Sequence, residues 1–476
     1  MIDPIRRRIR PAPAARLLAA VVTVASVSAA CSGGVNDGAP PAGVTSSPVT
    51  ALPSGPRPSA ASALGPDDWP TYHRDNSRHG VAPHLAARSA LSMSWSAKLD
   101  GAVYGQPLVV GTRLLAATEN DTIYALDPDT GQTLWSAHVG TPVPRAALPC
   151  GNIDPLGITG TMVYDPDTGL VFAVAEITGG HHILVGVDVS TGKLASRVTV
   201  DPPKGDPVAH QQRGALTLLR GRVYVPYGGL AGDCARYVGS VVSAPTTGAG
   251  GLRSYAIPTS REGGIWATPG GVVDGDRLLF AAGNGASHTN YDGSDSVISL
   301  TRDLTRADFF APSTWPLDNE SDLDLGSMSP VLVGRFVYIA GKRGVGYLLR
   351  PDRLGGIGGQ VSLKQSCRAF GGSAVDGDTM YLPCPDGPMA LRVGTDGTVT
   401  TVWKSAVAAA GSPVVGGGVV WVVDYDGGVL YALNPTTGGV LDKVTIGTAP
   451  HFASPTLSGG SAYVGTVRGV VAVNGA

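Results

Sequence analysis

The sequence IYALDPDTGQTLW at residues 123–135 decides the fold, because variants of it recur along the chain. The segments LVGVDVSTGKL at 184–194 and LYALNPTTGGVL at 430–441 repeat its order of an apolar run, a polar turn and a second run. In each copy the turn contains Asp or Asn, then Thr and Gly, the residue types that supply the backbone angles of a tight hairpin. Each copy therefore predicts two antiparallel strands joined by a short turn.

A second phrase precedes these hairpins. It occurs as QPLVVGTRLLAA at 106–117, SPVVGGGVVWVV at 412–423 and SPTLSGGSAYVG at 454–465, and it reads as two further strands around a Gly turn. Successive openings follow the roughly 40–50-residue period of a four-stranded propeller blade. Such units open near Pro107, Met162, Leu216, Pro269, Pro330, Ala374, Pro413 and Pro455.

We therefore expect an all-β protein whose residues 67–476 form an eight-bladed β-propeller, with seven blades as the competing count. The last unit ends at Ala476 with only three strands. The segment at 93–98 resembles the missing outer strand, so an N-terminal strand is expected to complete the C-terminal blade and close the ring. Closure in this way would remove two open sheet edges.

The composition agrees with a β-rich protein. The 476 residues include 67 Gly and 37 Pro, which excludes a mainly helical chain because both break helix interiors. An apolar content of 43% excludes a wholly disordered chain. The net charge is −2, and five Arg residues lie within the first thirty, so the body is mildly acidic. Nucleic acid is an unfavourable partner for such a surface.

The N-terminus reads as an export signal. An Arg cluster is followed by the apolar run LLAAVVTVASVSAA at 17–30 and then by Cys31. This order resembles a bacterial lipobox, so we expect residues 1–30 to be a signal peptide and Cys31 to be lipidated. Plain secretion is the alternative. Residues 31–66 are rich in Gly, Pro, Ser and Ala and are expected to be a flexible linker. The expected location is extracytoplasmic, with a lipid anchor in the bacterial cell membrane.

Four further cysteines remain: Cys150, Cys234, Cys367 and Cys384. An even number in an exported protein favours disulfides. Four cysteines allow three pairings. Cys367 with Cys384 would close a hairpin-sized loop, leaving Cys150 with Cys234, and this is the pairing we expect over the others. Buried free thiols are the alternative.

The segment DWPTYHRDNSRHG at 68–80 resembles the entry motif of the pyrroloquinoline quinone (PQQ)-like propeller family, and the hairpin phrase resembles its blade signature. The resemblance covers about residues 68–476. It implies the propeller fold. It implies much less about function, because the same fold serves dehydrogenases and non-catalytic scaffolds.

The resemblance to the quinoprotein alcohol dehydrogenases of this family also implies site residues. Glu176 and Asn284 match their Ca²⁺ ligands, and Trp266 matches the residue that stacks on the quinone. Lys342 matches the basic residue that faces the cofactor, and Asp322 or Asp324 falls where the catalytic base lies. Carboxylate and amide oxygens suit Ca²⁺, and an Asp would take the proton of an alcohol. Each of these residue types is also common in ordinary turns and blade packing.

Two functions compete on these observations. The chain lacks the adjacent-cysteine disulfide that covers the quinone in many such dehydrogenases, and it has no haem-binding CxxCH. We therefore favour a monomeric binding or scaffold propeller that docks a ligand or protein partner on one face. The alternative is a PQQ- and calcium-dependent dehydrogenase that oxidises an alcohol or sugar, with Asp322 as base. A hydrolase or lyase on the same fold is a third reading.

Overall fold

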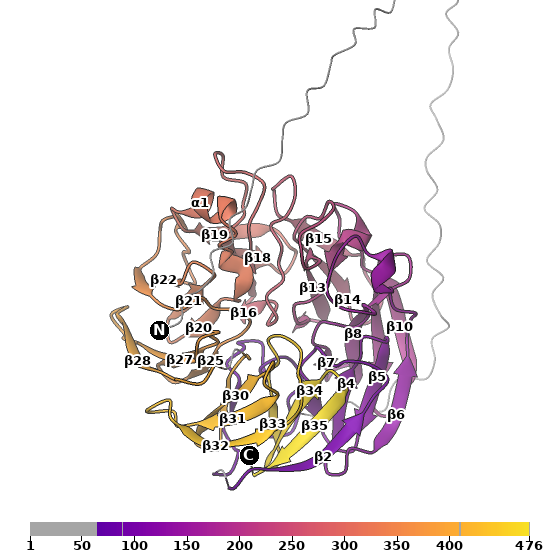
Figure 1. Ribbon diagram of the computed structural model, residues 1–476. Helices are drawn as coiled ribbons and strands as arrows, with labels where there is room; N and C mark the ends of the chain where they lie inside the picture. Colours follow the sequence, from indigo (N-terminus) through magenta and orange to yellow (C-terminus); the bar gives the residue numbers. More distant parts are fainter. Residues whose placement is uncertain (1–63, 88, 409–410, 476) are drawn as a thin grey trace, which may run out of the picture. The chain divides into compact units, whose positions relative to one another are not determined.

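The computed structural model describes residues 64–87, 89–408 and 411–475. In these residues the strands form eight separate sheets arranged around a ring (Figure 1). Each sheet has a core of four strands, and a few sheets gain a short extra strand at one edge. The eight-bladed propeller expected from the repeats is confirmed.

The strands of the first four blades follow chain order, and two short helices lie between them. They are β3 (Leu108–Val110), β4 (Arg113–Ala117), β5 (Thr122–Leu126) and β6 (Thr133–His138); η1 (Arg145–Ala147), β7 (Val163–Asp165), β8 (Leu170–Ile177), β9 (His181–Asp188) and β10 (Leu194–Thr199); η2 (Pro207–Ala209), β11 (His210–Gln211), β12 (Thr217–Leu219), β13 (Arg222–Gly229), β14 (Ser240–Pro245) and β15 (Arg253–Ala256); and β16 (Val272–Asp274), β17 (Arg277–Ala282), β18 (Ser296–Thr301) and β19 (Arg306–Ala311).

The last four blades repeat the arrangement, and two N-terminal strands join them. They are α1 (Trp315–Glu320), η3 (Leu325–Ser327), β20 (Val331–Val333), β21 (Phe336–Ala340), β22 (Val345–Leu349) and β24 (Ser362–Gln365), with β23 (Gly356–Ile357) pairing back to β19; β25 (Ala374–Asp376), β26 (Thr379–Leu382), β27 (Met389–Val393) and β28 (Val399–Lys404); β29 (Val414–Gly416), β30 (Val419–Asp424), β31 (Val429–Leu433) and β32 (Val440–Thr445), with β1 (Val81–Ala82); and β33 (Thr456–Ser458), β34 (Ser461–Thr466) and β35 (Gly469–Asn474), with β2 (Ser92–Lys98).

Strand β2 is the outer strand of the last blade. It runs antiparallel to β35 from Ser92, opposite Asn474, to Lys98, opposite Gly469. Strands from the two ends of the propeller thus share one sheet, in which β2 lies beside β35 (Figure 1).

The tryptophans of the repeat link neighbouring blades. Trp135, at the end of the hairpin phrase in the first blade, donates its indole N–H to the carbonyl of Val189 in the turn of the second blade, at 3.0 Å. Gly192 in that turn has a φ of +71°, and a Cβ there would lie 2.8 Å from the Trp135 ring. Trp95 and Trp403 make the same bond to the turns of the first and seventh blades, at Pro128 and Pro435. The turn glycine is therefore needed both for its backbone angle and for this close approach.

The N-terminal segment 69–80 hydrogen-bonds to every blade in turn. Its contacts are Trp69 with Val109, Pro70 with Tyr164, Asn76 with Leu218 and Val273, His79 with Leu332 and Val375, Gly80 with Val415, and His73 with Ser454. Arg78, only 2% exposed, adds bonds to Leu216, Thr217 and Gly271. The entry motif of the sequence therefore acts as a hub to which all eight blades attach.

The expected signal peptide at residues 1–30, Cys31 and the expected linker up to residue 63 lie outside the described residues. Within the described part, no helix is long and apolar enough to cross a membrane.

Candidate functional site

Loops from blades around the ring enclose a cavity of about 690 Å³. Its lining begins at Tyr104, before the first blade, and ends at Val467 in the last, so residues far apart in sequence meet there. Five residues that the sequence analysis singled out line it: Trp266, Asn284, Asp322, Asp324 and Lys342.

Four of these five residues form one hydrogen-bonded group. The Lys342 ammonium lies 2.6 Å from Asp322 Oδ1 and 2.6 Å from Asp324 Oδ2. Asn284 donates its backbone N–H to Asp324 Oδ1 at 2.7 Å and its amide N–H to Asp322 Oδ1 at 3.0 Å. The two aspartates therefore share one cation, and each accepts a separate N–H of Asn284.

The aspartates of this group differ in environment. The Asp324 side chain is 11% exposed, whereas that of Asp322 is 74% exposed. Burial raises the pKa of Asp324, although the Lys342 charge works against that rise. Burial would lower the pKa of Lys342, but the Asp324 and Asp322 carboxylates outweigh it and raise that pKa. Lys342 is therefore held as a cation by its two partners.

Trp266 lies beside this group. A side chain added at Gly283 would come 3.5 Å from Trp266 Nε1 and would clash with Asp324 Oδ1. A side chain at Gly264 would touch Trp266 at 3.3 Å and Tyr237 at 3.5 Å. The two glycines thus let an indole, a phenol and a carboxylate come together in one wall.

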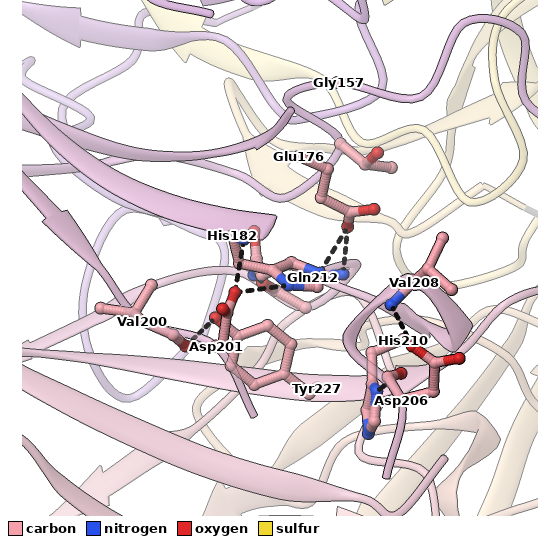
Figure 2. Close-up of polar contacts among 12 residues, drawn as sticks. Gly157, Glu176, His182, Val200, Asp201, Asp206, Val208, His210, Gln212 and Tyr227 are labelled. Atoms are coloured by element: carbon pink, nitrogen blue, oxygen red, sulfur yellow. Dashed lines mark hydrogen bonds and ion pairs between the residues drawn. The ribbon is translucent and has the colours of Figure 1, made fainter. Parts of the chain in front are cut away.

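Glu176 does not line the cavity; it lies in a separate buried cluster. Its Oε1 accepts the Gln212 backbone N–H at 2.5 Å and lies 3.6 Å from His182 Nε2. His182 also pairs through Nδ1 with Asp201 at 3.5 Å, and Figure 2 shows the imidazole beside both carboxylates. Burial opposes the charge on His182, but Glu176 and Asp201 raise its pKa to about 9.

Two further carboxyl groups, which the sequence reasoning missed, adjoin this cluster. Glu119 Oε2 accepts bonds from Gly157 N at 2.8 Å and Thr159 Oγ1 at 3.1 Å. Asp121 is fully buried, and neither of its carboxyl oxygens has a hydrogen-bond partner. Burial, helped by the neighbouring carboxylates, raises the pKa of both to about 8. The signal in the sequence was the pair of acids in TEND at 118–121, directly after an apolar strand.

The cavity also contains residues with unusual backbone angles that composition and spacing do not reveal. Asp233, Glu262, Asp322 and Phe452 line it with φ values of +48°, +66°, +52° and +67°. Left-handed conformations of residues other than glycine are uncommon and tend to gather at functional sites. The strain is greatest in principle for Phe452, because a bulky side chain gains no local hydrogen bond there.

Both expected disulfides are formed. Cys150 bonds Cys234 across 84 residues, and Cys367 bonds Cys384 across 17. The first joins two loops that line the cavity through Asn152 and Asp233. It therefore restrains the wall of the candidate site.

The residues of the cavity do not fit PQQ, a planar tricarboxylate. Its acidic side chains outnumber its two cations, Arg213 and Lys342, and Lys342 is already paired with two aspartates. Among the residues that the structure describes, no group of three or more His, Cys, Asp or Glu side chains is placed to share a metal. The carboxylates of an anionic ring would meet more acidic than basic side chains in this cavity.

Comparisons with known proteins give two kinds of relative. A family profile described as outer membrane protein assembly factor BamB matches residues 90–231. The dehydrogenase subunit of a quinone alcohol dehydrogenase from Komagataeibacter europaeus is 28% identical over 175 residues, which is 34% of this chain and 22% of the relative. The corresponding subunit from Gluconobacter oxydans (strain 621H) is 26% identical over 229 residues, 46% of this chain and 28% of the relative. The matches thus span little more than a quarter of these curated relatives.

Solved structures agree on the fold. Quinohemoprotein alcohol dehydrogenase from Comamonas testosteroni superposes with a TM-score of 0.62 at 17% identity, covering 86% of this chain and 80% of that one. BamB from Moraxella catarrhalis superposes with a TM-score of 0.57 at 16% identity, covering 81% of this chain and 99% of that one. At these identities the likeness is one of architecture, and an enzyme and an assembly factor share it equally.

Proposed function

We propose that this chain, which has a PQQ-like β-propeller fold, acts as a non-catalytic binding module, exported and held at the outer face of the membrane by a lipid on Cys31. In this proposal the cavity is the binding site for a ligand or for part of a protein partner. The chain is expected to act as a monomer, since each blade already has its neighbours within the ring.

The observation that carries the proposal is the state of the two candidate bases. Asp322 and Asp324 both contact the Lys342 ammonium at 2.6 Å. A general base must be free to accept a proton from its substrate, and oxygens of both carboxylates are already engaged by the Lys342 ammonium and by N–H groups of Asn284. The same group suits recognition, because it holds its acceptors and donors in fixed positions.

The two disulfides support export, since such bonds persist in oxidising compartments. The relative named as an outer membrane protein assembly factor is compatible with a protein partner for this chain. Metabolic labelling with a fatty acid tests the anchor. Label on the parent chain and none on the Cys31→Ala variant is the expected result.

The alternative is a PQQ- and calcium-dependent dehydrogenase with Asp322 as base. One observation favours it: Trp266, Asn284, Asp322, Asp324 and Lys342 converge on one cavity in the order of the family. The position of Glu176 in a different cluster and the acidic character of the cavity weigh against it.

The two functions are separated by titrating the purified exported chain with PQQ in the presence of Ca²⁺. We expect no change in the quinone spectrum at micromolar PQQ and no dye-linked oxidation of alcohols or sugars. Micromolar binding together with turnover, both lost in Asn284→Ala, would establish the dehydrogenase and refute the binding module.

A further inference from the structure

The acidic side chains of the cavity are in excess. They are Asp233, Glu262, Glu320, Asp322, Asp324 and Asp426. Two basic side chains, Arg213 and Lys342, also line the cavity, and Lys342 forms ion pairs with Asp322 and Asp324. The guanidinium of Arg213 lies 5.5 Å from the centre of the Tyr104 ring, in the wall of the cavity. Glu262 pairs with Arg261 at 2.7 Å, and Asp426 lies 3.8 Å from His451. The six acidic side chains still outnumber the arginine and lysine side chains beside them, so the lining keeps a net negative charge.

Three of these carboxylates act on Tyr237. The Tyr237 hydroxyl donates to Asp233 Oδ1 at 2.6 Å. Burial raises the pKa of Tyr237 above its usual range, and the Asp233, Asp324 and Glu262 carboxylates raise it further. Burial likewise raises the pKa of Glu262, with Asp233 and Asp324 adding to the rise against the nearby Arg261. Three carboxylates from three separate loops thus act on one aromatic ring.

Aromatic rings form the wall next to these carboxylates. Trp266 and Tyr237 flank Gly264, and Phe452 lies 6.1 Å from Trp266 between ring centroids. Phe370 stacks on Phe452 at 6.0 Å with 9° between the ring planes. Phe452 and His451 also line a second cavity of about 530 Å³, so the aromatic surface continues out of the first cavity.

Carboxylates beside the rings of a Trp and a Tyr in one cavity are the chemistry that recognises an organic cation. We propose that the cavity binds an ammonium or guanidinium group carried on an apolar stem, with the charge beside Tyr237 and Glu262 and the stem along Trp266, Phe452 and Phe370. This inference rests on the proposed binding function and names the class of ligand. It also accounts for a cavity that is unsuited to an anionic quinone.

Such a cation has two sources: a small free polyamine, or the Lys or Arg side chain of a protein partner. The experiment uses isothermal titration calorimetry on the exported chain with spermidine and with a capped peptide containing one arginine. A peptide that is identical except for citrulline, a neutral isostere of arginine, is the matched control. Tighter binding of spermidine identifies a free amine, and tighter binding of the arginine peptide identifies a partner side chain.

We expect the citrulline peptide to bind at least about tenfold more weakly than the arginine peptide. Glu262→Gln and Trp266→Leu should each weaken binding of the cation about five- to tenfold. Glu262→Gln preserves the shape of the side chain, so its effect can be read even if Trp266→Leu perturbs the fold. Asp303→Asn removes an exposed carboxylate that pairs with Arg253 outside the cavity and should leave the affinity unchanged.

Equal affinity for the arginine and citrulline peptides would overturn the inference, and so would the absence of binding by both cationic probes. Neither of these results brings PQQ turnover, so the proposed binding function would survive them. Micromolar binding of PQQ with turnover would instead refute the binding function itself.

Discussion

Arg78 offers the sharpest test of the hub formed by residues 69–80. Its guanidinium is buried and bonds five oxygen atoms at 2.6–3.2 Å, of which three belong to the third and fourth blades. The partners are Thr71 Oγ1, Tyr72 O, Leu216 O, Thr217 Oγ1 and Gly271 O. Arg78→Met keeps most of the side-chain volume and removes all five donors.

The magnitude follows from two opposing effects. A hydrogen bond to a charged group contributes about 1.5–3 kcal/mol net, and the carbonyls left behind would be buried without donors. Burying a guanidinium whose hydrogen bonds go to neutral oxygens costs several kcal/mol, and the substitution recovers that cost. Burial lowers the pKa of Arg78 to about 10, which shows that this cost is present. We expect a net loss of about 3–5 kcal/mol in the free energy of unfolding.

The assay is equilibrium unfolding in guanidinium chloride, followed by tryptophan fluorescence and circular dichroism. The matched control is Arg220→Met, because Arg220 is exposed and pairs only with an exposed Asp276. That change should cost less than about 1 kcal/mol. If the two variants unfold at the same denaturant concentration, the hub does not stabilise the ring and the reasoning fails.

Three further predictions concern stability. Replacing both cysteines of Cys150–Cys234 with serine should cost about 4.5 kcal/mol, against about 3 kcal/mol for Cys367–Cys384, because the first closes the longer loop; denaturant midpoints that rank the pairs in the opposite order would contradict this. Because burial raises the pKa of Asp121 from 3.8 to about 8, the folded state holds that proton more tightly than the unfolded chain does. The stabilisation from this proton is thus full below about pH 4 and is lost as the pH rises through about 8. Asp121→Asn should therefore make the melting temperature depend less on pH between these values, and an unchanged pH dependence would contradict the prediction. Gly192→Ala should lower the melting temperature more than Gly111→Ala, since both glycines have positive φ but only Gly192 faces a neighbouring tryptophan. Equal decreases would show that backbone strain alone causes the loss and that the tryptophan contact adds nothing.

The fold could be predicted because its information is local. Each blade repeats the same turn chemistry, and Trp135 with Gly192 shows that the repeat encodes the contact between blades as well. The spacing of residues in the sequence could not predict the surroundings of Glu176, because its position opposite His182 depends on how β8 pairs with β9. The backbone N–H that Glu176 accepts belongs to Gln212, which lies in the next blade.

The candidate site was predictable in part for a similar reason. Asn284 and Lys342 follow the inner strands of adjacent blades, so their convergence follows from the fold. Glu262 and Phe452 occupy loops whose left-handed backbone conformations no periodicity signals. The acidic character of the cavity emerges only when these loops are assembled, since the chain as a whole is nearly neutral.

The hub at residues 69–80 also constrains the order in which the protein can fold. The bond between His73 and Ser454 joins residues 381 positions apart, and it cannot form until the last blade exists. Closing so long a loop is slow, so the first part of the propeller to be synthesised is among the last to reach its final contacts. A ring that lacks a blade would leave the hub with unpaired donors. The segment thus makes completion of the ring a condition for stability, and it couples the first and last blades into one cooperative unit.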